Sequence, residues 1–80
     1  MLFMAKRREY NRLKVFVTRK KISRDELSTL LNKDVRTITR YLANEVQPSI
    51  PDLFTVAERM GIDARELIVS SLEPPTYIED

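Results

Sequence analysis

Residues 23–42 read SRDELSTLLNKDVRTITRYL, and this stretch contains two short helix patterns that meet at Asn32-Lys33. Ser23 followed by Glu26 forms a capping box, which predicts that the first helix begins directly after Ser23. Its apolar positions are Leu27, Leu30 and Leu31. Asn32 tolerates the left-handed backbone conformation that ends a helix tightly. A connection of only two residues therefore predicts a sharp corner.

The second helix is expected to begin after Asp34, another residue type that caps helices well. A tight corner between two amphipathic helices is typical of a helix-turn-helix. Packing the apolar residues of both helices inward turns the opposite face of the second helix to solvent. That face carries Val35, Arg36, Thr39 and Arg40. Because the major groove of DNA is wide enough for one helix, we expect that this face can enter it.

The spacing of apolar residues predicts three further helices, at about 10–20, 50–60 and 64–72. Gly61, the single glycine, stands where the second of these needs a left-handed end, and Pro74-Pro75 ends the last one. Scarce glycine and the lack of alternating apolar and polar residues argue against sheets. The expected fold is therefore all-α, a compact domain of five helices whose second and third form the helix-turn-helix.

The charges are distributed unevenly, although Lys and Arg exceed Asp and Glu by only 14 to 12. Residues 1–47 hold twelve basic and five acidic residues, a net charge of +7, whereas residues 48–80 hold two basic and seven acidic ones, a net charge of −5. This split suggests a half that binds a polyanion joined to an acidic half, with chance solvation of helical faces as the alternative. We divide the chain into a basic N-terminal arm (1–8), a helix-turn-helix DNA-binding domain (9–72, motif about 23–42) and an acidic, Pro-containing tail (73–80).

The amino-acid composition argues against an enzyme. Cys and His are absent, which removes disulfides, thiolate zinc sites, cysteine nucleophiles and histidine acid–base catalysis. Helix-start charge and capping explain the adjacent acids Asp25 and Glu26 better than catalysis does. We therefore expect no catalytic residue, no cofactor and no metal site. No apolar stretch approaches the roughly 18 residues of a membrane span, and Met1-Leu2-Phe3-Met4 is too short for a signal segment, so we expect a cytoplasmic protein.

The sequence from Ile22 to Tyr41 resembles the helix-turn-helix of lambda-repressor-like (Cro/Xre-type) transcription regulators. The similarity runs without a gap over about Leu13 to Ile68 and includes Gln47-Pro48-Ser49-Ile50, Leu53, Val56-Ala57, Met60-Gly61-Ile62 and Glu66-Leu67-Ile68. The resemblance implies a lambda-repressor-like fold. The chain departs from the family pattern, which usually has Ala at Ser28, Gly at Asn32, an apolar residue at Lys33, and polar residues at Leu30 and Leu42.

By the same resemblance, the expected base-reading residues are Val35, Arg36, Thr39 and Arg40. Arg36 and Arg40 can each offer paired donors to guanine, and Val35 can contact a thymine methyl. The expected phosphate contacts are Arg24, Lys33, Thr37 and Asn44, and Lys6-Arg7-Arg8 could form an arm that strengthens binding. The alternatives are that Val35 packs under the first helix, and that Arg36 and Arg40 only solvate their own helix.

The expected partner is double-stranded DNA, bound by a homodimer that reads a palindromic operator. One recognition helix reads only a few base pairs, and two half-sites about 34 Å apart double the site. The apolar dimer contact could come from Leu42, Ile68 and Leu72. The resemblance implies a small bacterial or phage regulator, such as a repressor, an antitoxin-like autoregulator or a restriction–modification control protein, that occludes or recruits RNA polymerase.

A protein-interaction module with the same fold but no specific DNA binding is the alternative function. Such a module could be antitoxin-like or a regulatory partner of another protein. It has no need for Arg24, Arg36 and Arg40 together on one basic face, so their presence favours DNA.

Overall fold

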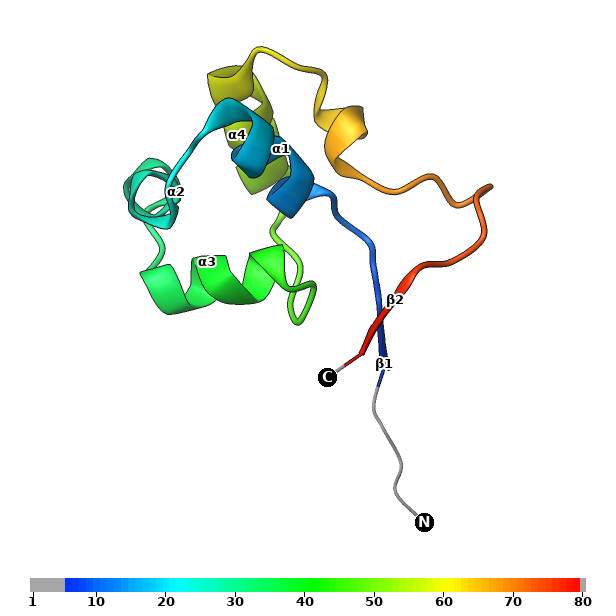
Figure 1. Cartoon of the computed structure of the whole chain (residues 1–80). Helices are drawn as coiled ribbons and strands as arrows, with labels where there is room; N and C mark the ends of the chain where they lie inside the picture. Colours follow the sequence, from blue (N-terminus) through cyan, green and yellow to red (C-terminus); the bar gives the residue numbers. More distant parts are fainter. Residues whose placement is uncertain (1–5, 80) are drawn as a thin grey trace.

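Four α-helices and one turn of 3-10 helix carry the fold in the computed structural model, which describes residues 6–79 (Figure 1). The two ends of that range form a short two-stranded sheet. In chain order the elements are β1 (Lys6–Arg8), α1 (Leu13–Lys20), α2 (Arg24–Leu31), α3 (Val35–Leu42), α4 (Ile50–Met60), the 3-10 helix η1 (Ala64–Leu67) and β2 (Tyr77–Glu79). The predicted helix-turn-helix is formed by α2 and α3.

Short polar side chains begin three of the helices at the predicted positions. Ser23, Asp34 and Ser49 each accept a hydrogen bond from the backbone N–H three residues later, at 3.0, 2.8 and 3.1 Å. Left-handed residues end two of these helices, Asn32 after α2 (φ 53°) and Gly61 after α4 (φ 71°). The local signals that predicted these boundaries are therefore confirmed.

Only one of the two hydrogen bonds of the capping box predicted at the start of α2 is formed. Ser23 accepts from the backbone of Glu26, but the Glu26 carboxylate lies 2.7 Å from the guanidinium of Arg59 on α4. This ion pair joins α2 to α4 at a partly exposed position. Surface ion pairs contribute at most about 1 kcal/mol, so the packing of these helices depends mainly on apolar contacts.

One apolar core fills the space between the helices. Its most buried side chains come one from each helical element, in the order Leu13, Leu27, Ile38, Val56 and Leu67. The other members are Phe16, Val17, Ile22, Leu31, Tyr41, Leu53, Ala57 and Met60. Burying a side chain of the Val, Leu or Phe type stabilises the fold by about 1.5–3 kcal/mol relative to leaving it exposed. These contacts fix how α2 and α3 cross.

The structure corrects the predicted fifth helix. Asp63 and Glu66 form the expected capping box, but helical structure ends after one 3-10 turn at Leu67. Ile68 has extended backbone and forms an isolated antiparallel bridge with Asn11. Hydrogen bonds of 2.8 and 2.9 Å on either side of this bridge use backbone groups that a longer helix would need. The long-range pairing replaces the helix that the local pattern predicted.

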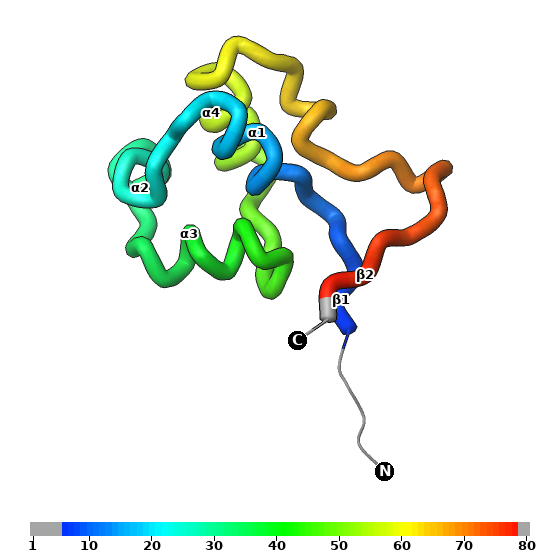
Figure 2. The backbone as a smooth tube through the Cα atoms, in the orientation of Figure 1, coloured from blue at the N-terminus to red at the C-terminus, as the bar shows by residue number. Residues whose placement is uncertain are grey.

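The small sheet is a second correction, because an all-α fold was predicted. β1 pairs with β2 in antiparallel register, with Lys6 opposite Glu79, Arg7 opposite Ile78 and Arg8 opposite Tyr77. Figure 2 shows the two ends of the described chain side by side. Residues 6–8 of the predicted basic arm are thus paired with residues 77–79 of the predicted acidic tail. Residues 1–5 and 80 of those segments lie outside the described residues.

Two buried asparagines, Asn11 and Asn44, connect segments that are far apart in the sequence. Asn44 Oδ1 accepts from the backbone N–H groups of Tyr10 and Asn11, both at 2.9 Å, and Asn44 Nδ2 donates to Asn11 O at 3.1 Å. Asn11 Nδ2 donates in turn to Tyr41 O at 2.9 Å and to Gln47 Oε1 at 2.8 Å. The amides therefore join the segment before α1 to the end of α3 and the following loop.

Asn11 also sets the start of α1. Asn11 Oδ1 accepts from Leu13 N at 3.1 Å, and α1 begins at Leu13 instead of near Tyr10 as the apolar spacing predicted. Arg12 N donates to Leu67 O and Val69 N donates to Tyr10 O, so the residues before Leu13 pair with the end of η1 and the segment after it instead of extending the helix. Tyr10 is exposed as a result and does not join the core.

Replacing Asn44 by Gly tests the amide connection. Both Asn44 and Asn32 have left-handed backbone, with φ of 59° and 53°, so glycine keeps the conformation at either position. Asn44→Gly leaves buried N–H groups without a partner, and we expect the free energy of unfolding to fall by about 2 kcal/mol in urea titrations. Asn32→Gly, at an exposed position, is the matched control and should change it by less than about 0.5 kcal/mol. Equal effects of the two substitutions would contradict this account.

Candidate nucleic-acid interface

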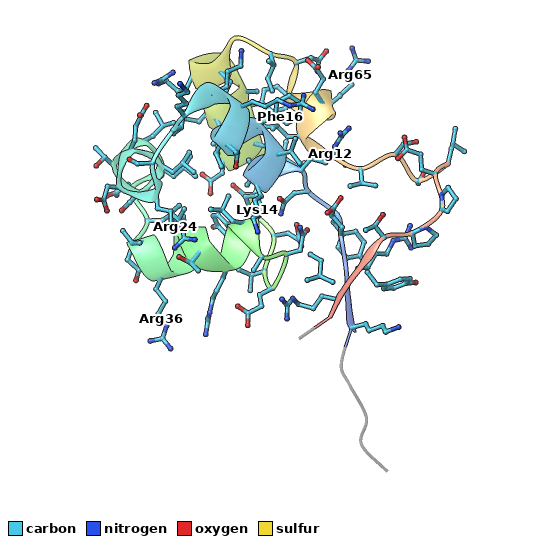
Figure 3. All side chains as sticks on the ribbon, viewed as in Figure 1. Arg12, Lys14, Phe16, Arg24, Arg36 and Arg65 are labelled. Carbon is cyan, nitrogen blue, oxygen red and sulfur yellow. The ribbon has the colours of Figure 1, made fainter. Side chains whose placement is uncertain are left out.

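The recognition candidate α3 has one buried and one exposed face. Ile38 and Tyr41 point into the core, and Val35, Arg36 and Arg40 lie on the exposed face. The exposed fraction of the Val35 side chain is 39%, so Val35 does not pack under α1. Figure 3 shows the Arg36 side chain extending away from the body of the molecule. Two guanidinium groups and one apolar side chain are therefore available on the outer face of this helix.

Hydrogen bonds between Ser28 and Lys33 close the corner between α2 and α3. Lys33 N donates to Ser28 O at 3.1 Å, and the Ser28 hydroxyl donates to Lys33 O. Between them Asn32 supplies the left-handed residue. These contacts account for the departures from the family pattern at Ser28, Asn32 and Lys33, because the Ser28 hydroxyl holds the backbone of the turn while the Lys33 side chain is exposed.

Asp34 fixes the first turn of α3 and is itself held in the charged form. Hydrogen bonds from the backbone and the side chain of Thr37 lower the pKa of the Asp34 carboxyl below its ordinary value, and the positive charges of Arg36 and Arg40 lower it further. The negative cap also lies at the positive end of the helix dipole. The three groups that stabilise Asp34 all belong to the predicted DNA-contacting helix.

A hollow of about 380 Å³ lies between α1, the start of α2 and the end of α3. Its lining includes two cations, Lys14 and Arg24, and the hydroxyl-bearing Thr18 and Thr39. In Figure 3 the labelled Lys14 and Arg24 side chains both lie between α1 and α3. Arg24 was a predicted phosphate contact, but Lys14 was counted only as one of many basic residues. Its position at the start of α1, four residues before Thr18, was the available signal.

The other residues predicted to contact DNA lie on α3 or at its start and differ in how exposed they are to solvent. Lys33 is exposed at the corner, and Thr37 and Thr39 are half-buried along α3. Arg40 Nε lies 4.0 Å from a carboxylate oxygen of Glu45, a separation at which the pair is weak. The guanidinium of Arg40 can therefore exchange this contact for another acceptor at little cost.

Asn44 is buried and does not lie where it could make the phosphate contact predicted for it. Its side chain is 6% exposed, and both its oxygen and its nitrogen bond the backbone of residues 10 and 11. An amide that is occupied inside the protein is not available for a phosphate group. The structure therefore gives Asn44 a structural role, and the prediction failed because its partners lie more than 30 residues away.

The predicted basic arm is folded onto the domain in the part that the structure describes. Arg7 Nε donates to Ala43 O, the carbonyl at the end of α3, at 3.2 Å. The Arg8 guanidinium lies over the Tyr10 ring, 5.6 Å from its centre. Cations near the carboxyl end of a helix stabilise it, so Arg7 supports α3.

The three residues predicted for a dimer contact do not share one surface. Leu42 packs partly against the core and lines the hollow near Lys14. Ile68 lines a different groove, beside Ile50 and Phe54. Leu72 is 95% exposed on the connection that leads to β2. An interface built from all three is therefore not supported by their positions.

Two further observations concern residues 6–79. No group of three or more carboxylate side chains in this range is arranged to hold a metal ion. None of the helices described above has the length and apolar character needed to cross a membrane.

A family model described as Helix-turn-helix matches residues 13–67. This range contains α1 to η1 and covers more than half of the chain. The chain belongs to the Cro/C1-type (Xre) helix-turn-helix family. The predicted resemblance is thus confirmed, and the chain is a DNA-binding domain of the transcriptional-regulator type, which is not a family of enzymes.

Solved structures agree with this assignment. A provisionally assigned DNA-binding protein from Bacteroides fragilis is 34% identical, with a TM-score of 0.71, and the match covers 81% of this chain and 100% of that one. A transcriptional regulator from Listeria innocua shares the fold at 23% identity, with a TM-score of 0.65, over 82% of this chain and 65% of that one. No curated protein matches the sequence.

Asp34 gives the interface a pH dependence that can be measured. Its lowered pKa means that it adds stability above pH 3.8, its ordinary value, and that this stability is lost as the pH falls through the lowered value. Asn also caps helices but does not titrate. We therefore expect Asp34→Asn to lose less thermal stability than the parent chain between pH 5 and pH 2, as measured by circular dichroism.

Asp63 serves as the comparison for this experiment. Arg65 bonds the Asp63 carboxylate and lowers its pKa to about 2, so Asp63 contributes a similar acid-dependent loss at the other end of the molecule. Asp63→Asn should also flatten the profile, whereas only Asp34→Asn should alter the titration of the amides in α3 followed by NMR. An unchanged Asp34→Asn profile would show that the cap does not hold its charge as described.

Proposed function

We propose that this chain is a homodimeric transcriptional regulator that binds a palindromic sequence in double-stranded DNA. The observation that carries the proposal is the pairing of two basic features around one helix. Arg36 and Arg40 lie on the outer face of α3, and Lys14 and Arg24 line the hollow beside it. The first pair can read bases while the second holds the sugar-phosphate backbone.

Base reading is assigned to the exposed face of α3. Arg36 extends from the first turn, where a helix that enters the major groove by its amino end meets base edges. A guanidinium can give paired hydrogen bonds to guanine O6 and N7, and an exposed Val35 can contact a thymine methyl group. Arg40, one turn further along, extends the same strip, and Thr39 beside it is half-buried and also lines the hollow.

Phosphate binding is assigned to the groups around the hollow and the corner. Arg24 stands in the first turn of α2, where free backbone N–H groups and the helix dipole also favour an anion. Lys14 approaches the same hollow from α1. Lys33 and Thr37 can add contacts next to the corner, and Asn44 is left out because it is buried. The DNA-binding unit on this proposal is residues 9–72, with the motif at about 23–42.

A homodimer follows from the small number of base pairs that one α3 can read. Two copies related by a two-fold axis place their recognition helices in successive major grooves, about 34 Å apart. A regulator bound in this way controls transcription by occluding RNA polymerase or by recruiting it.

Selection of bound sequences from a random duplex library tests the proposal. We expect an enriched palindrome whose affinity falls steeply between about 50 and 200 mM salt, because each neutralised phosphate releases counterions. Folded protein that enriches no sequence at low salt would instead support the alternative, a protein-interaction module that uses the same fold.

Single substitutions separate base reading from phosphate binding. Arg36→Ala should reduce discrimination at one base pair in each half-site by about 1–3 kcal/mol. Arg24→Ala and Lys14→Ala should weaken binding to all sequences alike and reduce the salt slope by about 1 each. Both effects are measurable by fluorescence anisotropy on the selected duplex and on single-base variants of it.

Arg59→Ala is the control for charge alone. Arg59 lies on α4 and is paired with Glu26, so its loss should leave both affinity and salt slope nearly unchanged. A uniform loss of affinity in Arg36→Ala, without relaxed preference at any position, would mean that Arg36 is not a base reader.

A further inference from the structure

The paired chain ends lie outside the part of the chain that matches the family model. β1 and β2 flank the matched range, residues 13–67, on its two sides. Together they form a two-stranded ribbon of three residue pairs. Because a ribbon of this size is marginal by itself in water, its place depends on contacts with the rest of the domain. Those contacts indicate what the ribbon does in this chain.

One face of the ribbon rests on the end of α3. Arg7 and Ile78 stand opposite each other in the register, so their side chains share a face. Arg7 Nε donates to Ala43 O at 3.2 Å, and Arg7 and Ile78 are both half-buried. Both also line a pocket of about 420 Å³, whose wall includes Val15 of α1 and Leu42 and Ala43 at the end of α3. Figure 1 shows the ribbon on the side of this end of α3, away from its start.

The end of α3 has no side chain of its own that can bond its last carbonyl groups. A helix leaves these groups without partners inside the helix. The residue that caps α3 is Ala43, whose methyl group is not a donor. Arg7 therefore supplies a donor from a segment 36 residues away in the sequence. The last turn of α3 also carries Arg40, one of the residues assigned to base reading.

The ribbon supports α3 without being part of the core. Within the described residues 6–79, the buried side chains of the core all lie between Leu13 and Leu67. The ribbon instead contributes half-buried side chains on its inner face, and Tyr77 on its outer face is 55% exposed. Substitutions in the ribbon should therefore leave the fold intact and act on the end of α3.

We propose that β2 and Arg7 position the last turn of α3 and so determine how selectively Arg40 reads DNA. This inference rests on the proposed function, in which the outer face of α3 reads bases. β2 holds β1 against the domain, β1 carries Arg7, and Arg7 holds the carbonyl group at the end of α3. A helix end that is not held can adapt to a wrong base pair, because its side chains are not fixed in one orientation. Arg7 is therefore a positioning residue and need not touch DNA.

Hydrogen exchange of backbone amides, followed by NMR without DNA, tests the positioning directly. The amides of residues 43–45 donate to carbonyl groups of α3 near its end, whereas the Thr37 amide donates to the cap at its start. Arg7→Ala removes one hydrogen bond from the end of the helix. We expect exchange at residues 43–45 to become about fivefold to tenfold faster and exchange at Thr37 to stay unchanged. Circular dichroism verifies that the variant is folded.

Neighbouring residues on the outer face of the ribbon provide matched controls. Arg8→Ala removes the same charge as Arg7→Ala, but the Arg8 guanidinium lies over the Tyr10 ring. Tyr77→Gln and Ile78→Gln change adjacent residues of β2 whose side chains point to opposite faces. We expect Ile78→Gln to speed the exchange of the amides at the end of α3, whereas Arg8→Ala and Tyr77→Gln should leave it unchanged.

Discrimination between DNA sequences tests what this positioning does. Arg40→Ala and Arg36→Ala first identify the base pair that depends on each residue, with single-base variants of the selected palindrome. Arg7→Ala should then lower discrimination about threefold to tenfold at the Arg40 base pair and leave the Arg36 base pair unchanged. Arg7→Lys keeps a donor for Ala43 O and should recover most of the loss. Arg8→Ala should leave both ratios unchanged, even if its affinity for all sequences falls.

The two experiments separate this inference from the proposed function. Unchanged exchange in Arg7→Ala would overturn the positioning, whether or not the chain binds DNA. Faster exchange with unchanged discrimination, or the lack of any base pair that depends on Arg40, would overturn the link to base reading. A parent chain that binds no duplex selectively would instead contradict the proposed function, while exchange still decides whether Arg7 holds the end of α3.

Discussion

The buried contact between Asn11 and Asn44 holds the fold together at the point where the recognition helix ends. Buried amide groups without partners are costly, and here the Asn44 side-chain amide bonds both the backbone N–H and the backbone carbonyl of Asn11. Through Asn11 the segment before α1 also bonds Tyr41 O, in the last turn of α3, and the bridge to Ile68 brings the segment after η1 to the same place. The first, middle and last parts of the domain therefore meet at one polar cluster, and the orientation of α3 depends on it.

The recognition helix is fixed at both ends by different means. At its start, Asp34 caps the first turn and the Ser28–Lys33 hydrogen bonds hold the corner. At its end, the Asn11 side-chain amide donates to Tyr41 O and Arg7 donates to Ala43 O, two carbonyls that a helix terminus leaves without partners. A helix restrained in this way presents its outer side chains in one orientation. Because the helix is already held in one conformation, DNA binding loses less conformational entropy, and this favours selective recognition.

The sequence predicted the features whose causes lie within a few residues. The caps at Ser23, Asp34 and Ser49, the left-handed ends and the inner and outer faces of α3 all follow from local chemistry. It did not predict the shortened last helix, the paired chain ends or the inward position of Asn44, because each depends on hydrogen bonds across 30 or more residues. Asn44 illustrates the limit well, since a polar residue after a recognition helix suits a phosphate contact until its buried partners are known. Lys14 was missed for a similar reason, because only the crossing of α1 over α3 brings it near Arg24.

The charge distribution has a simple physical meaning once the fold is known. The basic half of the sequence supplies α1 to α3 and therefore the whole of the hollow and the reading face, whereas the acidic half supplies α4, η1 and the groove. Like charges on the DNA-facing side favour a polyanion and oppose self-association there. The near-neutral total thus results from two parts of the domain with opposite net charge, a basic part that contains α1 to α3 and an acidic part that contains α4 and η1.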